Sequence, residues 1–158
     1  MISFKANETQ TFNLRAAYLI MQEDRMLFQR FREDEYWFLP GGRVEMMEDS
    51  PATIRREIDE EYGWKVKDQR LVWVGENLFH LQGTAYHEIG FYYFVQIEDE
   101  LDVTAEDFSC REGISISRWI PIKQFDQYSI VPPFLKQATD LDQLKHNYEI
   151  KHFINREE

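Results

Sequence analysis

The stretch between residues 40 and 63 constrains the fold of this chain most, because it carries start and stop signals for a loop and a helix. The Pro-Gly-Gly run at residues 40–42 ends the preceding strand and lets the backbone turn and approach a ligand closely. Ser50 suits a helix N-cap, Pro51 suits the first helical position, and Gly63 suits the residue that ends a helix. The sequence therefore predicts a glycine-containing loop followed by a helix over about residues 50–62.

The segments around this unit predict a mixed β-sheet with helices packed on its faces. Runs rich in apolar and aromatic residues predict strands at residues 12–21, 26–31, 70–81, 84–98 and 114–120. The Pro-Pro pair at 132–133 opens a second predicted helix, over about residues 134–144, and the polar tail 151–158 is expected to fray. Strands mixed with two helices indicate the α/β class.

Length and composition predict one domain over residues 1–158. A chain of 158 residues, 43% hydrophobic and 15% aromatic, can bury one substantial core. Its first residues contain no apolar signal region, and no stretch approaches the roughly 18 unbroken apolar residues of a spanning helix. Cys110 is the only cysteine, which excludes an intrachain disulfide and fits a reducing compartment. We expect a soluble, cytoplasmic protein with no membrane partner.

The acidic balance of the chain narrows the class of ligand. Its formal net charge of −11 argues against polymeric nucleic acid, whose phosphates are normally met by a basic face. An acidic protein can still bind a small phosphorylated molecule where bound cations invert the local charge. The positions of the acidic residues are therefore more informative than their number.

Three glutamates of the predicted helix share one face. Glu57, Glu60 and Glu61 stand at i, i+3 and i+4, within a sector of about 100°. Ile54 and Ile58 fall in the adjoining sector and would hold the helix against the sheet. Clustered carboxylates repel one another unless a cation offsets them, and Mg²⁺ prefers such oxygen ligands. A solvated charged face is the alternative interpretation of the same spacing.

The register between the loop and the helix favours the metal-binding interpretation. Residues 42–48 read Gly-Arg-Val-Glu-Met-Met-Glu, and seven residues later 56–64 read Arg-Glu-Ile-Asp-Glu-Glu-Tyr-Gly-Trp. This pattern resembles the box of the Nudix hydrolase family, and every position that the family pattern specifies is filled. A chance match at one register is on the order of one in ten million. The last thirty or so residues match nothing recognisable.

The resemblance implies a fold, a reaction and residue roles. The fold would be an α/β/α sandwich, and the reaction metal-dependent cleavage of a diphosphate linkage in a nucleotide derivative, with Mg²⁺ or Mn²⁺ as cofactor. The implied metal ligands are Glu57, Glu60, Glu61 and the backbone carbonyl of Gly42, and Glu57 also counts among the catalytic residues. Arg56 and Glu48 match a supporting pair in which the arginine orients a glutamate of the box.

The chain departs from the family pattern at two positions near the site. Many members have glycine just before the glutamate matched by Glu48, where this chain has Met47, so a different loop path is possible. Members usually carry alanine where this chain has Ile54, which predicts altered packing rather than lost chemistry.

The general base has several candidates. In some members resembling this chain it is a glutamate of the box, and in others an acid on a later loop. Glu106, Asp107 and Glu112 lie on such a loop, and Glu112 is favoured because it comes shortly before the strand predicted at residues 114–120. A solvated loop carboxylate is an equally good interpretation of Glu112.

Substrate-binding residues can be nominated by chemistry alone. Arg32 and Arg43 flank the Gly-Gly run and could contact phosphate oxygens, although solvated arginines are more common. Aromatic rings could stack on a base, with core packing as the alternative. The aromatic candidates are Trp37, Phe79, Tyr86 and Tyr92, and we predict Phe79 as the substrate-binding residue among them. His87 and Glu88, inside an apolar strand, predict a structural hydrogen bond, with a site role as the alternative.

Other functions stay open at this point. A Nudix-like sensor could bind nucleotide without cleaving it, but such modules usually lose acidic residues of the box. The isopentenyl diphosphate isomerases share the fold, yet their active-site cysteine context is not evident around Cys110. Homodimers are frequent among chains resembling this one, and an exposed first strand at residues 4–13 could pair across an interface.

Overall fold

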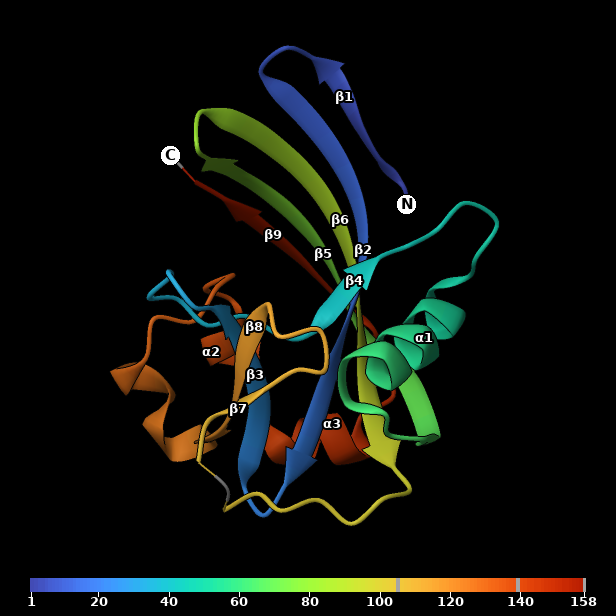
Figure 1. Ribbon diagram of the computed structural model, residues 1–158, viewed down its shortest axis with the longest axis vertical. Helices are drawn as coiled ribbons and strands as arrows, with labels where there is room; N and C mark the ends of the chain where they lie inside the picture. The colour runs from blue at the N-terminus through green and yellow to red at the C-terminus, as the bar shows by residue number, and fades with distance from the viewer. Residues whose placement is uncertain (105, 139, 158) are drawn as a thin grey trace.

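A long, strongly twisted mixed sheet runs through the computed structural model, and helices cover both of its faces (Figure 1). The structure describes residues 1–104, 106–138 and 140–157, with the side chains of residues 137, 138, 141 and 142 also left undescribed. No helix in these ranges is long and apolar enough to cross a membrane.

The sheet is built around strand β2. Its order is β7-β8-β3-β2-β6-β5-β9, and β1 and β4 also pair with β2. The pairs β2–β6 and β5–β9 are parallel, and the other pairs are antiparallel. The strands are β1 Ser3–Asn7, β2 Gln10–Gln22, β3 Arg25–Phe31, β4 Gly41–Arg43, β5 Val66–Leu81, β6 Thr84–Ile97, β7 Phe108–Ser109, β8 Ser115–Pro121 and β9 Lys151–Arg156.

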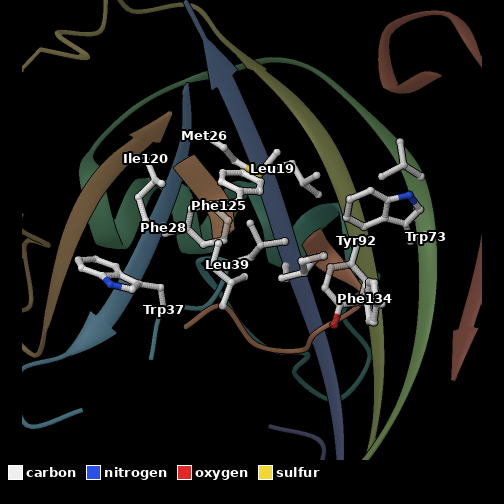
Figure 2. Packing of buried hydrophobic residues seen from close by; sticks show 14 of the residues in the cluster. Leu19, Met26, Phe28, Trp37, Leu39, Trp73, Tyr92, Ile120, Phe125 and Phe134 are labelled. Carbon is white, nitrogen blue, oxygen red and sulfur yellow. The ribbon is translucent and has the colours of Figure 1, made fainter. Parts of the chain in front are cut away.

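Strand β2 has a core on each side because its apolar residues run without interruption. Ala16, Tyr18 and Ile20 face the core under helix α1, which is Ser50–Tyr62. Ala17 and Leu19 face the opposite core. Figure 2 gives a close view of buried residues in this core. A strand buried on both faces reads as a continuous hydrophobic run, as this one does.

Helices cover the second core as well. Residues from α2 (Leu135–Ala138) and α3 (Leu141–His146) belong to it, as does Phe125 of the 3₁₀ helix η1 (Ile122–Gln127). The expected α/β sandwich with a mixed sheet is therefore confirmed.

Helix α1 follows the predicted boundaries closely. Ile54 and Ile58 are fully buried against the sheet, as their spacing predicts. Gly63 ends the helix in the left-handed conformation, with φ of 69°, and its N–H donates to the carbonyl of Asp59. The N-cap prediction is wrong by one residue, because the Asp49 side chain accepts from the N–H of Ala52, while the Ser50 hydroxyl contacts Tyr93.

Three other predictions of secondary structure are wrong. The segment predicted as one helix over 134–144 forms α2 and α3, because Asp140 is not helical and its side chain accepts from the N–H of Gln143 at the start of α3. Residue 139 lies outside the described residues. The Gly-Gly run, predicted to open a loop, first forms β4 against β2. The first strand predicted at 4–13 is instead the hairpin of β1 and β2.

The C-terminal tail is also ordered rather than frayed. Residues 151–156 form β9, which pairs in parallel with β5, and Glu158 lies outside the described residues. The Phe153 ring stacks on Phe134, with centroids 4.5 Å apart and planes 3° from parallel. Aromatic burial of this kind holds an otherwise polar strand at the sheet edge.

Candidate active site

The loop before α1 is organised around the carboxylate of Glu48. One of its oxygens accepts from the backbone N–H of Glu45 at 3.0 Å and from the hydroxyl of Thr53 at 2.8 Å. Val44 anchors the start of the loop, since it is buried and its N–H donates to the carbonyl of Leu14. Glu48 thus has a fixed position before any ligand is bound.

Arg56 connects this loop to the carboxylates of α1. Its Nε and Nη2 donate to the two oxygens of Glu48 at 2.8 and 3.0 Å, a bidentate contact. Its Nη1 donates to Glu57 at 2.7 Å and to Glu60 at 3.3 Å. The hydrogen bonds from Arg56 lower the pKa of Glu48 to about 2, and those to Glu48 raise the pKa of Arg56. The arrangement matches the supporting pair that the resemblance implies.

Glu57 packs against the backbone of β4. A Cβ atom at Gly42 would collide with the Glu57 carboxylate, so only glycine permits this approach. Gly41 is constrained more strongly, because a Cβ there would collide with the backbone of Ala16, which cannot move aside as a side chain can. The Gly-Gly run therefore allows β4 to lie between β2 and the carboxylate of Glu57.

Glu61 lies in a different environment from Glu57 and Glu60. It is 7% exposed and accepts a hydrogen bond from the side-chain amide of Gln29 on β3. The same amide donates to the Tyr62 hydroxyl at 2.7 Å, which also contacts the Ser117 hydroxyl of β8 at 2.6 Å. Burial raises the pKa of Glu61 to about 8, although the hydrogen bond from Gln29 opposes the shift.

The carboxylates of α1 are suitable ligands for a hard divalent cation, although the Arg56 guanidinium contacts two of them. In the described ranges, no three His, Cys, Asp or Glu side chains are grouped closely enough to hold an ion. Magnesium, however, is commonly held by one or two carboxylates together with substrate phosphates and water. Glu57 and Glu60 already bracket one cationic group, the Arg56 guanidinium, and Glu57 lies against the Gly42 backbone. These residues fit such an ion.

A cavity of about 370 Å³ opens on the face of the sheet opposite α1. Arg43 and Phe79, both nominated as substrate-binding residues, line it, together with Tyr86 and Tyr92. Arg15 also lines the cavity, beside Arg43 in the β2–β4 register. The cavity thus has a basic end at β4 and an aromatic end at the tip of β5 and β6.

Two nominated substrate residues lie away from this cavity. Arg32 is exposed and donates to the Ser109 hydroxyl at 2.8 Å, so it tethers the β7 segment instead. Trp37 is 4% exposed and belongs to the core, which was the alternative interpretation. Both residues are close to the Gly-Gly run in sequence, but neither lines the cavity.

The candidate bases on the later loop differ in their contacts. Asp107 forms a bidentate contact with Arg118, at 2.5 and 2.6 Å, which lowers its pKa. Glu106 and Glu112 are exposed. The turn of Glu112 meets the end of α1, because the N–H of Arg111 donates to the carbonyl of Glu61 at 2.7 Å. Asp107 thus forms an ion pair, whereas Glu112 is exposed in a turn that meets the C-terminal end of α1.

Sequence reasoning missed several polar residues in strands. Gln29 contacts Glu61, Arg15 lines the cavity, and Asn77 donates to the Glu88 carboxylate at 3.3 Å. Their common signal is a polar side chain inside an otherwise apolar strand, where burial demands a partner. The hydrogen bond predicted for Glu88 is present, whereas the His87 ring lies beside Phe12.

Comparison with known proteins identifies the family. The NUDIX domain family matches residues 12–141 of the chain. The chain is 39% identical over 85 residues to diphosphoinositol polyphosphate phosphohydrolase 2 of Rattus norvegicus, covering 48% of each protein. It is 27% identical over 115 residues to the CMP-5'-(N-acetyl-N-hydroxy-3-aminopropyl)phosphonate hydrolase of Streptomyces rubellomurinus, covering 69% of this chain and 52% of that one. The chain spans about half the length of these relatives.

Solved structures share the fold. The MutT protein of Bacillus halodurans superposes with a TM-score of 0.64 at 17% identity, covering 90% of each chain. A UDP-X diphosphatase gives a TM-score of 0.60 at 23% identity, covering 94% of this chain and 69% of that one. Since residues 12–141 reach from β2 into α3, the family match includes both the carboxylate helix and most of the cavity.

Proposed function

Because the chain belongs to the NUDIX domain family, we propose that it is a metal-dependent hydrolase that cleaves the diphosphate linkage of a nucleotide or nucleotide derivative. The two curated relatives described above are named as hydrolases of phosphate- or phosphonate-containing molecules. We take residues 1–158 as one such domain, acting on a small phosphorylated substrate and not on polymeric nucleic acid.

One observation carries this proposal: a single strand, β4, lies between the glutamates of α1 and the cavity. Gly42 lies against the Glu57 carboxylate, and the next residue, Arg43, lines the cavity. Successive residues of a strand point to opposite faces, which accounts for this division. A substrate in the cavity could therefore extend its phosphates past β4 toward the carboxylates of α1.

The metal would be held by Glu57, Glu60 and Glu61, with the backbone carbonyl of Gly42. Bound Mg²⁺ or Mn²⁺ would neutralise the charge on the diphosphate oxygens and lower the pKa of an attacking water. Arg56 and Glu48 keep the carboxylates oriented, because Arg56 bonds Glu48, Glu57 and Glu60 at once. Such support from outer groups commonly changes activity by about 10- to 100-fold when removed.

The remaining roles follow from charge and shape. Arg43 and Arg15, at the basic end of the cavity, are suited to bind phosphate oxygens. Phe79 and Tyr86 lie parallel with centroids 5.1 Å apart and offer an aromatic surface to a flat ring. Glu112 is our choice of general base, since its exposed turn adjoins the end of α1.

The test is hydrolysis of a substrate panel with Mg²⁺ or Mn²⁺. The panel holds nucleoside triphosphates, oxidised nucleotides, ADP-ribose, nucleotide sugars, dinucleoside polyphosphates and a diphosphoinositol polyphosphate. We expect turnover that chelator abolishes and that Glu57→Gln and Glu61→Gln reduce by at least 100-fold. Asp59→Asn, an exposed acid on the same helix, is the matched control and should leave the rate unchanged. Equal rates in wild type and a folded Glu57→Gln variant would overturn the proposal.

Arg56 favours a second candidate function, a nucleotide-binding module without catalysis. Its guanidinium donates to both Glu57 and Glu60, so these carboxylates have a cationic partner within the protein itself. That candidate predicts nucleotide binding without turnover of any panel member, and binding that chelator does not weaken. Calorimetry with and without chelator separates the two functions.

A further inference from the structure

A row of polar side chains crosses the sheet along the wall of the cavity. Glu88 on β6 is the register partner of Asn13 on β2 and of Asn77 on β5. Asn77 is in turn the partner of Asn155 on β9. All four residues line the cavity, so four neighbouring strands present amide and carboxylate groups in one line. We call these four residues the polar row.

The neighbouring rows of the sheet differ sharply from the polar row. On one side the partners are Phe79 and Tyr86, which form the aromatic end of the cavity. On the other side Arg15 is the partner of Gly90, and beyond it the register reaches the β4 strand and Arg43. The sheet therefore orders its groups as aromatic, polar and basic, with the basic row nearest the carboxylates of α1.

Glu88 is the only acid of the polar row, and it has spare capacity to accept hydrogen bonds. Its one contact, over the ranges that the structure covers, is the Asn77 amide at 3.3 Å, and no ion pair involves it there. An ionised carboxylate accepts and does not donate, with two oxygens and about four lone-pair directions. Most of that capacity faces no protein donor.

The neighbouring amide is held so that it supports Glu88. Asn77 is 3% exposed, and its Nδ2 donates both to Glu88 and to the Tyr92 hydroxyl, at 3.2 Å. Its Oδ1 has no hydrogen-bond partner in the described part of the chain. A buried polar atom without a partner in the protein is uncommon, and one explanation is that it accepts a hydrogen bond from a ligand.

From this arrangement we infer that the cavity selects substrates whose flat ring carries an exocyclic amino group, and that Glu88 accepts hydrogen bonds from that group. The inference rests on the proposed function, because it takes the cavity as the place where the cleaved substrate binds. A ring over Phe79 and Tyr86 would turn its edge toward the polar row, and its phosphates toward Arg15 and Arg43. An edge with oxo groups in place of the amine would set lone pairs against the carboxylate, which is unfavourable.

Matched nucleotide pairs test this directly. GTP and ITP differ only by an amino group against hydrogen; CTP and UTP differ by an amino group against an oxo group and also by the hydrogen on the adjacent ring nitrogen of UTP. We would measure calorimetric affinity for methylene-bridged analogues of all four with Mg²⁺, and kcat/KM for the natural nucleotides. Wild type should favour the amino member of each pair by about tenfold or more, the effect of one charge-assisted hydrogen bond.

The variant Glu88→Gln keeps the size of the side chain and should reduce each preference below about threefold. Glu76→Gln is the matched control, because Glu76 precedes Asn77 on β5, does not line the cavity and contacts His152 instead. It should keep the wild-type preference. Equal affinity for both members of a pair in wild type, or an unchanged preference in Glu88→Gln, would overturn the inference.

The two readouts separate this inference from the proposed function. Amino-selective binding without turnover of any diphosphate supports the role of Glu88 and contradicts the hydrolase. Metal-dependent turnover of a nucleotide diphosphate linkage, with equal binding of the amino-bearing and amino-lacking nucleotides, overturns the role of Glu88 and leaves the proposed hydrolase standing.

Discussion

Helix α1 holds its carboxylates in two opposite ways. Arg56 bridges Glu57 and Glu60 to Glu48 of the preceding loop, a group that we call the Arg56 cluster, and the Glu60 side chain is 46% exposed. Glu61 is instead 7% exposed and is held by Gln29, a neutral amide from β3. Glu60 and Glu61 are adjacent in sequence, yet one turns to a cation near solvent and the other into the core.

The environment of each glutamate, and not its spacing along the sequence, therefore decides its charge state. A guanidinium stabilises the ionised form, and accordingly the pKa of Glu48 falls to about 2. Burial beside a neutral amide disfavours the ionised form, and the pKa of Glu61 rises to about 8. A divalent cation would compensate Glu61 most, because its carboxylate is buried and has no cationic partner in contact within the described ranges.

The largest effect is expected from Arg56→Met, which removes the cation from the Arg56 cluster. The change leaves Glu48, Glu57 and Glu60 without their shared donor, and the first two are mostly buried. We expect the free energy of unfolding to fall by about 3 kcal/mol and kcat/KM to fall by roughly 100-fold. Urea unfolding and steady-state kinetics measure the two quantities.

Arg55→Met is the control for this substitution. Arg55 is the neighbouring arginine on the same helix and is exposed. Its removal should change the free energy of unfolding by no more than about 0.5 kcal/mol. If Arg56→Met and Arg55→Met behave alike, the bridging arginine does not organise the Arg56 cluster.

A somewhat smaller effect is expected from the pH dependence of Glu48→Gln. The folded pKa of about 2 lies below the unfolded value near 4.3, so the stabilisation is present above pH 4.3 and is lost as pH falls through about 2. At pH 7 we expect Glu48→Gln to destabilise the protein by about 2–3 kcal/mol, because Arg56 loses its bidentate partner. The gap between wild type and variant should narrow from pH 5 to pH 2.

Urea midpoints at pH 7, 5, 3 and 2 follow this gap directly. The exposed Glu33 serves as a control, because Glu33→Gln should leave the difference small at every pH. A gap for Glu48→Gln that stays constant down to pH 2 contradicts the role of the ion pair.

Outside the Arg56 cluster, Gln29→Leu removes the donor that Glu61 and Tyr62 share. The Tyr62 hydroxyl keeps its contact with Ser117, but the buried carboxylate loses its only side-chain donor in the described ranges. We expect a loss of about 1–3 kcal/mol in metal-free protein and a roughly tenfold lower kcat. Gln96→Leu, an exposed glutamine on β6, should change neither quantity noticeably.

A metal titration distinguishes a positioning role of Gln29 from a purely structural one. If Gln29 positions Glu61 for a divalent cation, Gln29→Leu should raise the Mg²⁺ concentration needed for half-maximal rate, whereas a purely structural role would lower stability alone. Unchanged stability and an unchanged metal requirement would show that Glu61 keeps its place without Gln29.

The sequence predicted local features of the site well because they depend on short-range signals. The Gly-Gly run, Gly63 and the isoleucine spacing act within a turn or two, so the bounds of α1 follow from them. The pairing of Arg56 with Glu48 spans eight residues and followed from the family pattern. Long strands such as β5 and β6 followed from their composition.

Features that depend on distant contacts could not be predicted this way. Gln29 reaches Glu61 across 32 positions, and only the fold brings β3 beside α1. Strand β9 forms because β5 offers an unpaired edge and Phe134 offers a ring to stack on, neither of which the polar tail reveals. The polar row depends on the register of four strands, which no single segment encodes.

The smallest effect is expected at Met47, in the loop that presents Glu48. Its φ of 67° is left-handed, a conformation that glycine adopts readily, so glycine could follow the same loop path. The side chain is 97% exposed, and removing it sacrifices little packing. Relief of about 1–2 kcal/mol of backbone strain, less the roughly 0.5–1 kcal/mol entropic cost of glycine, predicts that Met47→Gly stabilises the protein by about 0.5 kcal/mol.

Met46→Gly is the control for Met47→Gly, and it should change the free energy of unfolding in the opposite direction. Met46 is also exposed but its φ is not positive, so glycine there has no strain to relieve and should destabilise by about 0.5–1 kcal/mol. Thermal unfolding of both variants in one buffer compares them. Opposite signs mean that the loop holds Met47 in its left-handed conformation and so places Glu48 against Arg56. Equal losses mean that the loop relaxes, and that Arg56 alone organises the Arg56 cluster.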